Sequence, residues 1–315
     1  MRSGIRSRKF AASDSSFETQ WTEHADETGR PYYHNVSTGV SVWEKPGSTS
    51  AQIGSTWQEG LDGKRVLVAG MFRRRDGQVE REIVQIMTEL RARSPGSSPN
   101  VFCLTDAGHA QEATEALDGI EGALEPAVGD WFRFFTIESV IAACKPHIVI
   151  CAVQGHASDD EHTSYMANRQ LMDACVAVGG VQRFVMLSAL GAGDSEGTVP
   201  AAAKIGMRPI MLDLTMAERR LEEKMNPKGL AWSVVRAGPI SSDPYTGSSV
   251  VTESMASYGT VGASDIAEIL LRSATSPSAE GKTLAALDRT KILITTPYVR
   301  QLMSFEPLPF DTVAL

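Results

Sequence analysis

The chain has 315 residues, of which 42% are hydrophobic and 22% are charged. This composition is typical of a globular protein with one large domain and room for a small one. A net charge of -8 argues against a general nucleic-acid binder, and no apolar run approaches the roughly 20 residues that a transmembrane helix needs.

Residues 1–18 form a basic, serine-rich segment. Its cationic residues Arg2, Arg6, Arg8 and Lys9 precede the first acidic residue, Asp14. The segment lacks the apolar core of a secretory signal. Two interpretations stay open for it, a disordered tail and a fragment of an organelle-targeting peptide.

Residues 19–47 have the pattern of a small antiparallel sheet. Turn signals at Thr28-Gly29 and Thr38-Gly39, with alternation between them, predict three short strands. The tryptophans Trp21 and Trp43, followed three residues later by Pro46, complete a segment that resembles a WW domain.

The WW resemblance implies a proline-binding module. Two sets of residues carry it: a buckle of Trp21, Tyr33 and Pro46, and a groove of Tyr32, Ser41 and Trp43. Such a groove suits a proline-rich segment of a partner, because polyproline is already ordered before it binds. Val36 replaces the usual specificity histidine, which weakens the case for a Pro-Pro-x-Tyr ligand. A WW fold kept only for packing against the larger domain is the alternative.

Residues 48–63 are rich in glycine, serine and threonine and are predicted to be a linker, with Trp57 and Leu61 anchoring its end on the next domain.

Residues 64–290 follow as a nucleotide-binding domain. Its start, Val66 to Ala69, is a buried-strand run that ends on Gly70 and leads into a helical pattern, the first unit of a Rossmann-type sheet.

The loop after Gly70 departs from the dinucleotide-binding pattern. Arg73 stands where the second glycine is expected, and Arg74 and Arg75 follow it. Two interpretations remain open. The arginines form a solvated surface turn in a fold that has lost its ligand, or their guanidinium groups bind phosphate in place of the glycine contact.

Further strands alternate with helices along the domain. Strands are predicted at 101–105, 124–128, 148–153, 183–189 and 231–237, and helical patterns at 137–144, 164–178 and 210–225. This order predicts an α/β fold with a doubly wound, parallel Rossmann-type sheet. Ligands in such a sheet bind beyond the carboxyl ends of the strands, so the loops after Gly70, Thr105, Val128, Val153 and Ala189 are expected to share one crevice.

These loops resemble the atypical short-chain dehydrogenase/reductase superfamily, especially its NmrA-like members. The matching positions are Gly129-Asp130, Cys151-Ala152-Val153, Asn168, Ser188, Arg236 with Gly238-Pro239, and Ala263 to Ala267, where Ser264 is expected to cap a helix. The resemblance implies an NAD(P)-binding domain over roughly residues 64–288. It implies cofactor contacts at Gly70, Gly129, Asp130, Ala152, Val153 and Ser188, with Arg73 and Arg74 as further candidates.

The choice between NAD and NADP stays open. Asp106 follows the second strand and is placed to accept a hydrogen bond from a ribose 2'-hydroxyl, which favours NAD. The arginines from Arg73 to Arg75 favour the 2'-phosphate of NADP instead. As a third interpretation, Asp106 is a loop or helix-capping carboxylate.

The catalytic tyrosine and lysine of the superfamily are missing. Their positions align near Leu214 and Glu218, and no tyrosine occurs between Tyr165 and Tyr245. A glutamate beside the cofactor ribose would raise the pKa of a nearby phenol rather than lower it. Ser188 is the one catalytic candidate. No histidine is placed by sequence to activate it as a nucleophile, so its hydroxyl is expected to bind a ligand or to cap a helix instead.

An aromatic cluster and the cysteines are the last informative groups of residues. Four aromatic residues surround Arg133 and form either core or an exposed partner surface: Trp131, Phe132, Phe134 and Phe135.

The four cysteines are scattered along the chain, at Cys103, Cys144, Cys151 and Cys175. They predict buried, reduced thiols in an intracellular compartment, the cytoplasm or an organelle such as a plastid or mitochondrion. No metal site is expected, because the six histidines lack ligand spacing.

Two functions follow from these patterns. One is a non-catalytic or regulatory NAD(P)-binding protein that its WW module recruits to a proline-rich partner or a larger complex, with no nucleic acid involved. The other is an atypical oxidoreductase or isomerase without the tyrosine–lysine pair. Residues 291–315 are predicted to be a docking tail, since Pro307 and Pro309 favour an extended segment.

Overall fold

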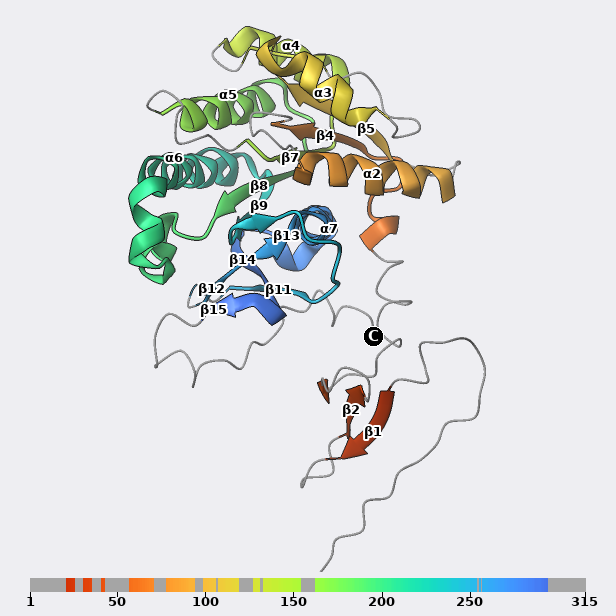
Figure 1. Ribbon diagram of the computed structural model, residues 1–315. Helices are drawn as coiled ribbons and strands as arrows, with labels where there is room; N and C mark the ends of the chain where they lie inside the picture. The colour runs from red at the N-terminus through yellow and green to blue at the C-terminus, as the bar shows by residue number, and fades with distance from the viewer. Residues whose placement is uncertain are drawn as a thin grey trace, which may run out of the picture. The chain divides into compact units, whose positions relative to one another are not determined.

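The computed structural model describes residues 21–25, 31–35, 41–42, 57–70, 78–93, 99–105, 107–118, 127–130, 133–153, 162–253, 255 and 257–293. The chain divides into two compact units, residues 1–60 and 61–315. Figure 1 shows the elements of both units.

The first unit contains a three-stranded sheet. Its strands are β1 (Trp21–Ala25), β2 (Pro31–Asn35) and β3 (Ser41–Val42), in the order β1-β2-β3. Both pairings are antiparallel, with Trp21 opposite Asn35 and Tyr33 opposite Val42. The predicted meander is therefore confirmed. The orientations of Tyr32, Ser41 and Trp43 lie outside the described side chains.

The second unit is built on an eight-stranded sheet of order β11-β14-β9-β8-β7-β4-β5-β6. Its members are β4 (Arg65–Ala69), β5 (Asn100–Thr105), β6 (Ala127–Val128), β7 (Ile148–Cys151), β8 (Arg183–Ala189), β9 (Ala231–Ala237), β11 (Ser249–Thr252) and β14 (Lys282–Asp288). All neighbours pair in parallel except β11, which is antiparallel to β14. The doubly wound α/β sheet is as predicted.

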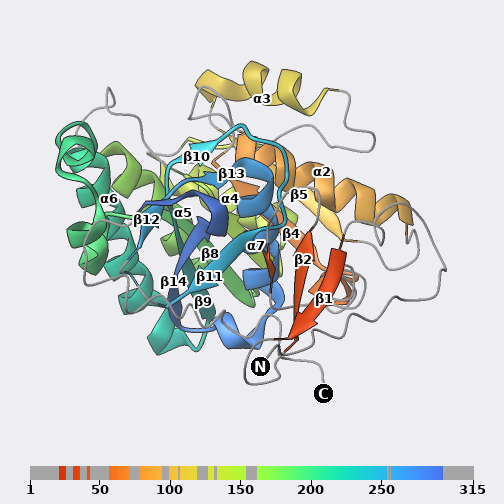
Figure 2. The same ribbon diagram turned by 60° about the horizontal axis from the view of Figure 1, so that its bottom comes forward.

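Helices cover both faces of this sheet. The helices α4 (Phe134–Cys144), α5 (Thr163–Val178) and α6 (Ala201–Met225) share the larger core with β4, β7, β8 and β9. The other face carries α2 (Gln78–Arg93), α3 (Ala110–Leu117) and α7 (Ala263–Thr275). Figure 2 shows α3 at the outer edge of the domain. The strands are buried from both sides, which explains their continuous apolar runs.

Helix α6 begins nine residues before the predicted start at Ile210. It runs from Ala201 and contains Pro209 in its interior. Proline removes one backbone donor and usually ends or kinks a helix. Here packing of Leu214, Ala217 and Leu221 in the core outweighs that local cost, since all three are fully buried.

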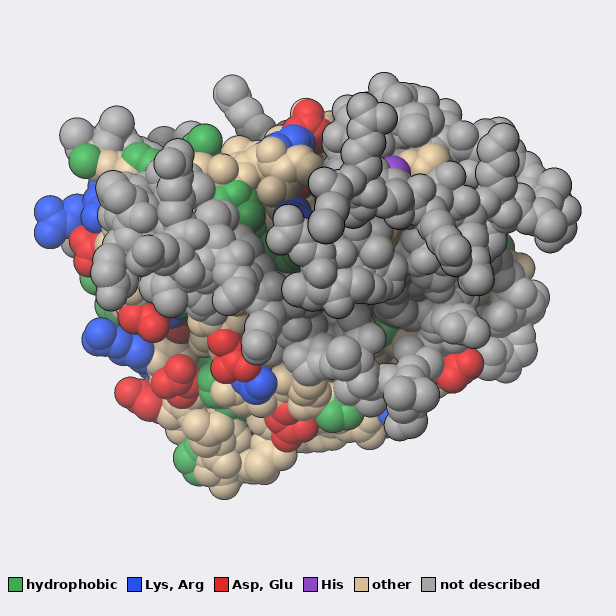
Figure 3. All heavy atoms as spheres, turned by 90° about the horizontal axis from the view of Figure 1, so that it is seen from below, with side chains coloured by type: hydrophobic (Ala, Val, Ile, Leu, Met, Phe, Trp, Pro, Cys, Tyr) green, Lys and Arg blue, Asp and Glu red, His purple; other side chains and the backbone are tan. Residues whose placement is uncertain are grey.

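Small elements complete the region after β9. Strand β10 (Ile240–Ser241) pairs with β13 (Val261–Gly262), and β12 (Tyr258–Gly259) pairs with β15 (Ile292–Leu293). Figure 3 shows that acidic and basic side chains are interspersed on the described surface of one face. None of the described helices is long and apolar enough to cross a membrane. Leu61, at the start of the unit, is fully buried, as predicted for an anchor.

Candidate functional site

The turns after β4 and β7 meet at Gly70. This glycine has φ of +113°, and a Cβ there would lie 2.7 Å from the nitrogen of Val153 and 2.8 Å from the carbonyl carbon of Ala152. The amide of Ala152 donates to the carbonyl of Ala69 over 2.8 Å. Only glycine fits at position 70, because the backbone of Ala152 and Val153 occupies the space that a side chain would need and cannot move aside. The predicted convergence of these two turns is present.

Asn168 holds the β7 turn from behind. Its Nδ2 donates to the carbonyls of Val153 and Ser164 at 3.0 and 2.9 Å, and its Oδ1 accepts from the Cys151 thiol at 3.1 Å. The side chain is completely buried. Buried amides of this kind stabilise one loop conformation, because every alternative leaves a polar group unpaired. Asn168 therefore positions Ala152 and Val153 rather than facing the crevice.

Gly129 and Asp130 follow β6, the edge strand of the sheet beside β5. The Gly129 amide donates to the carbonyl of Thr105, and a Cβ at this glycine would lie 2.7 Å from Ile137 Cδ1. The Asp130 amide donates to Thr136 Oγ1, and its half-exposed carboxylate lies 3.3 Å from Arg133. Arg73, Arg74 and Asp106 lie outside the described residues, so their roles remain predictions.

A buried ion-pair network occupies the carboxyl ends of β8 and β9. Ser188 and Arg236 are partners in the strand register. The Ser188 hydroxyl donates to Glu218 Oε1 at 2.5 Å, and Arg236 donates to both Glu218 oxygens at 3.1 and 2.8 Å. Arg236 also pairs with Asp194. Burial alone would lower the pKa of Arg236, but the hydrogen bonds and charges of Glu218 and Asp194 raise it.

This network gives Glu218 a different position from the one expected beside a cofactor ribose. Its carboxylate faces Arg236 and Ser188 and is buried with them. Leu214, one turn earlier, is fully buried in the core. No tyrosine occurs anywhere along α6, so a shift of the alignment by a turn does not restore the missing phenol. The pairing of Glu218 with Arg236 was missed because the two residues belong to different elements.

Comparison with known proteins agrees with this fold. A family model described as NAD(P)H-binding matches residues 108–277, more than half of the chain.

The chain belongs to the NAD(P)H-binding family.

The match begins after β5 and so does not include the Gly70 turn of the NAD(P)H-binding domain. A WW domain model matches residues 18–46, which confirms the predicted module. Comparison with curated proteins gives no significant match.

Solved structures show the same fold for the NAD(P)H-binding domain. The anaerobilin reductase ChuY from Escherichia coli O157:H7 is 17% identical with a TM-score of 0.58, and 71% of this chain covers 97% of that chain. A putative NAD-dependent epimerase/dehydratase from Bacillus halodurans is 19% identical with a TM-score of 0.56, covering 72% and 94%. Identities this low establish the fold alone.

The two ends of the crevice differ in how well they suit NAD(P)H. Near Gly70, the glycine makes a tight turn against the backbone of Ala152 and Val153, as the first glycine of a dinucleotide-binding loop does. Near Ser188, the carboxylate of Glu218 is already engaged by Arg236. The residues therefore fit the nucleotide end of the cofactor better than the nicotinamide end.

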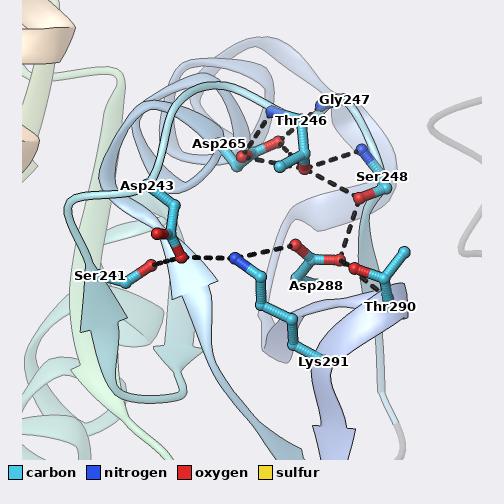
Figure 4. A network of polar contacts seen from close by, with 9 residues as sticks. All are labelled: Ser241, Asp243, Thr246, Gly247, Ser248, Asp265, Asp288, Thr290 and Lys291. Carbon is cyan, nitrogen blue, oxygen red and sulfur yellow. Dashed lines mark hydrogen bonds and ion pairs between the residues drawn. The ribbon is translucent and has the colours of Figure 1, made fainter.

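A polar network holds the loop after β9 against α7 and β14 (Figure 4). Asp265 accepts from the amides of Thr246 and Gly247 at 3.1 and 3.0 Å. Lys291 lies between Asp243, at 2.5 Å, and Asp288, at 3.7 Å. The loop is thereby fixed to residues that are far away in sequence.

The expectation that Ser264 caps α7 is wrong. The N-cap is Gly262, and no side chain makes a capping hydrogen bond there. Asp265 does lie in the first turn, as predicted, but its carboxylate binds the 246–247 loop. The helix begins at Ala263, so Ser264 already lies inside the first turn and is not at the capping position.

His162 and Asp213 form a pair that sequence spacing does not reveal. His162 Nδ1 lies 2.8 Å from Asp213 Oδ1, and Asp213 Oδ2 accepts from the amide of Tyr165 at 3.1 Å. Asp213 is buried on α6, and through this hydrogen bond its carboxylate holds the first turn of α5. Since 51 residues separate the pair, only tertiary packing brings it together.

The aromatic cluster divides between core and surface. Phe134 packs against the main core, whereas Phe135 is 78% exposed, and their rings meet edge to face at 5.8 Å. Trp131 and Phe132 lie outside the described residues.

The four cysteines are free. Three of them are buried, namely Cys103, Cys151 and Cys175, while Cys144 is only partly buried, contrary to expectation. Within the described part of the chain, no group of three or more His, Cys, Asp or Glu side chains is arranged to hold a metal.

Proposed function

We propose that the protein is a non-catalytic or regulatory member of the NAD(P)H-binding family, recruited through its WW module to a proline-rich partner in a larger assembly. One observation carries this proposal: the end of the crevice at β8 and β9 is occupied by the Ser188–Glu218–Arg236 network. Bound NAD(P)H would supply a hydride, but reduction of a carbonyl also needs a proton donor. Helix α6 provides neither a tyrosine nor a lysine at the aligned positions.

Nucleotide binding is assigned to the loops that follow β4, β5, β6 and β7. Gly70, Ala152 and Val153 would lie against the pyrophosphate, and Gly129 with Asp130 would lie at the adenine end. Arg73 and Arg74 would bind phosphate, while Asp106 would favour NAD. Support for this assignment comes from the tight glycine turn that follows β4, the position of the first glycine in a dinucleotide-binding loop.

A cofactor titration with a matched turnover assay tests the proposal. The full chain is titrated with NADPH and with NADH while nicotinamide fluorescence is followed. Saturable binding is expected, without oxidation of the cofactor in the presence of a panel of aldehydes and ketones. Oxidation that depends on one of these substrates would overturn the non-catalytic proposal.

The second candidate is an atypical NAD(P)-dependent oxidoreductase or isomerase. The glycine turn after β4 favours it, since it resembles the first glycine of a dinucleotide-binding loop. Ser188 would then orient the substrate, after the loss of its hydrogen bond to Glu218. Failure to bind either cofactor at about millimolar concentration, a weak affinity on the free-energy scale, would exclude this candidate.

The WW module is assigned a proline-rich ligand in the groove of Tyr32, Ser41 and Trp43. Fluorescence polarisation of a labelled proline-rich peptide tests this with Trp43→Ala in the full chain. Thr22→Ala, at an exposed position on β1, is the control. Loss of binding is expected for Trp43→Ala only, and equal binding by both variants would show that the groove is unused.

We further assign the protein to an intracellular, reducing compartment, the cytoplasm or an organelle, without a nucleic-acid partner. Burial raises the pKa of Cys103 and of Cys151 to about 12, so both remain protonated and unreactive. The net charge of -8 disfavours binding to polyanions. Fractionation of cells, with nuclease treatment of the purified protein, checks both statements.

A further inference from the structure

A buried glutamate lies at the start of helix α2. Glu80 belongs to the first turn of this helix, and its side chain is only 4% exposed. It precedes Ile83 and Val84 by three and four residues, and both of these are buried. Glu80 therefore stands on the apolar stripe of the helix, where a hydrophobic side chain would ordinarily pack against the sheet. Burial of a charge is unfavourable, so an electrostatic role is the natural explanation for a glutamate at this position.

The carboxylate of Glu80 lies near the carboxyl end of β4. Helix α2 packs against β4 and β5. Burial is the main cause that raises the pKa of Cys103 on β5 and of Cys151 on β7, and the charge of Glu80 raises both further. In the strand register the two cysteines lie opposite the last two residues of β4. Because a charge acts strongly only at short range, Glu80 lies at the level where β4 ends and the Gly70 turn begins.

The first turn of α2 is the part of a dinucleotide-binding unit that ordinarily attracts the pyrophosphate. Its first amide groups have no partners within the helix, and the helix dipole is positive at this end. In this chain the carboxylate of Glu80 already interacts with that dipole, which lowers the positive potential that a pyrophosphate would meet. The carboxylate also repels the pyrophosphate directly, and more strongly than in water, because the dielectric constant around a buried group is lower.

We infer that Glu80 is a selectivity residue of the dinucleotide site, whose carboxylate weakens binding of the pyrophosphate without affecting binding of the uncharged adenosine part. The inference rests on the proposed function, because it concerns the site assigned there to the loops after β4, β5, β6 and β7. It implies a lowered affinity for NADH and NADPH alike. Occupancy of such a site follows the concentration of the nucleotide, which suits the proposed regulatory role.

Glu80→Gln in the full chain tests this inference, because it removes the charge and keeps the shape of the side chain. Isothermal titration calorimetry measures the Kd of NADH, of ADP-ribose, which retains the pyrophosphate, and of adenosine, which has no phosphate. The Kd of NADH and of ADP-ribose is expected to fall about five- to fiftyfold, as for the removal of one charge several ångströms from an anion. The Kd of adenosine is expected to stay unchanged.

Glu82→Gln is the matched control. It makes the same change of charge on the same helix, at a position that is less buried. We expect it to leave the Kd of ADP-ribose within about twofold of that of the original chain, since an exposed charge is screened by solvent. Equal gains in Glu80→Gln and Glu82→Gln would overturn the inference, because the net charge of the chain would then explain the effect. An equal gain for adenosine would overturn it as well.

A second variant covers the case in which Glu80→Gln does not fold, which circular dichroism during thermal unfolding reports. Glu80→Leu then takes its place, because it puts an apolar side chain on the stripe, and the same fall in the Kd of ADP-ribose is expected. The two proposals fail in different ways. Binding of ADP-ribose that neither substitution of Glu80 strengthens would overturn the role of Glu80 alone. Absence of binding of NADH, NADPH and ADP-ribose to the original chain and to the variants would overturn the nucleotide site, and this role with it.

Discussion

The two ends of the crevice are built in different ways. Around Gly70 the contacts are between backbone atoms, and the glycine brings β4 and β7 turns together without any side chain. Around Ser188 the contacts are between side chains, and the charges of Glu218 and Arg236 are satisfied within the protein. The carboxyl end of β4 is therefore held by backbone packing, and the carboxyl ends of β8 and β9 by buried side-chain charges.

The largest expected effect comes from removing the cation of the network. Arg236→Met leaves the carboxylate of Glu218 buried and unpaired, and the free energy of unfolding is expected to fall by about 3–5 kcal/mol in urea unfolding. Asp194→Asn removes the other ion pair of Arg236, but the Asp194 side chain is 80% exposed. A loss of about 1 kcal/mol or less is expected there.

A double variant protects this test against simple failure to fold. Arg236→Met combined with Glu218→Leu removes both buried charges and is expected to recover most of the lost stability. If the double variant is no more stable than Arg236→Met, the network is not the source of the loss.

The second prediction concerns the opposite end of the crevice. Gly70→Ala adds a methyl group 2.7 Å from the Val153 nitrogen at positive φ, so steric overlap and backbone strain act together. A loss of about 2–4 kcal/mol is expected from thermal or urea unfolding. Gly179→Ala is the matched control, because it has φ of +74° with nothing within 4 Å. Its strain alone is expected to cost about 1–2 kcal/mol, because φ of +74° with ψ of −176° is a conformation essentially restricted to glycine. Equal losses in the two variants would mean that close approach at Gly70 is unimportant.

The third prediction concerns acid stability and the loop network of Figure 4. Burial alone would raise the pKa of Asp288, but hydrogen bonds from Thr290 and Ser248 and the charge of Lys291 hold it below its ordinary value of 3.8. A carboxyl group with a lowered pKa stabilises the fold above its unfolded-state pKa, and this contribution is lost as the pH falls through the folded-state pKa.

The pH dependence of unfolding by urea checks this sign. The free energy of unfolding of the original chain is expected to fall as the pH drops below about 4. Asp288→Asn is expected to be less stable by about 1–2 kcal/mol near neutral pH and to lose less on acidification. An unchanged acid slope in this variant would assign the pH dependence to other carboxylates.

The smallest effect is expected at the outer edge of the crevice. Phe135→Ser changes a side chain that is 78% exposed, and its free energy of unfolding is expected to stay within about 0.5 kcal/mol. Phe134→Ala, which removes a ring packed on the core, is expected to cost more, about 1–3 kcal/mol. A large loss at Phe135 would mean that its ring is covered in the folded protein.

The comparison also separates features that local patterns predict from features that they miss. The β4 strand and the Gly70 turn were predictable, because four buried apolar residues followed by glycine form a local signal. Strand β14 was not predicted, since the run from Lys282 to Asp288 has no helical pattern after it to mark a crossover. The start of α6 was also missed, because Pro209 is a strong local argument for a helix boundary.

For the candidate site, residue types were easier to predict than partners. Ser188 was located at the end of its strand, and the absence of a tyrosine from α6 was evident. The network of Ser188, Glu218 and Arg236 was not, because its members lie on β8, α6 and β9.

Sequence by itself determined the α/β class, the WW module and the absence of a tyrosine between Tyr165 and Tyr245. Each of these depends on residue identity or on periodicity within about 30 consecutive residues, the size of one βαβ unit. Tertiary structure alone decided which carboxylate faces Arg236, which aspartate pairs with His162 and which glycine approaches the backbone of another turn. These are contacts between elements, and their geometry is set when strands and helices pack, because a buried charge or donor is stabilised only by the partner that packing places beside it.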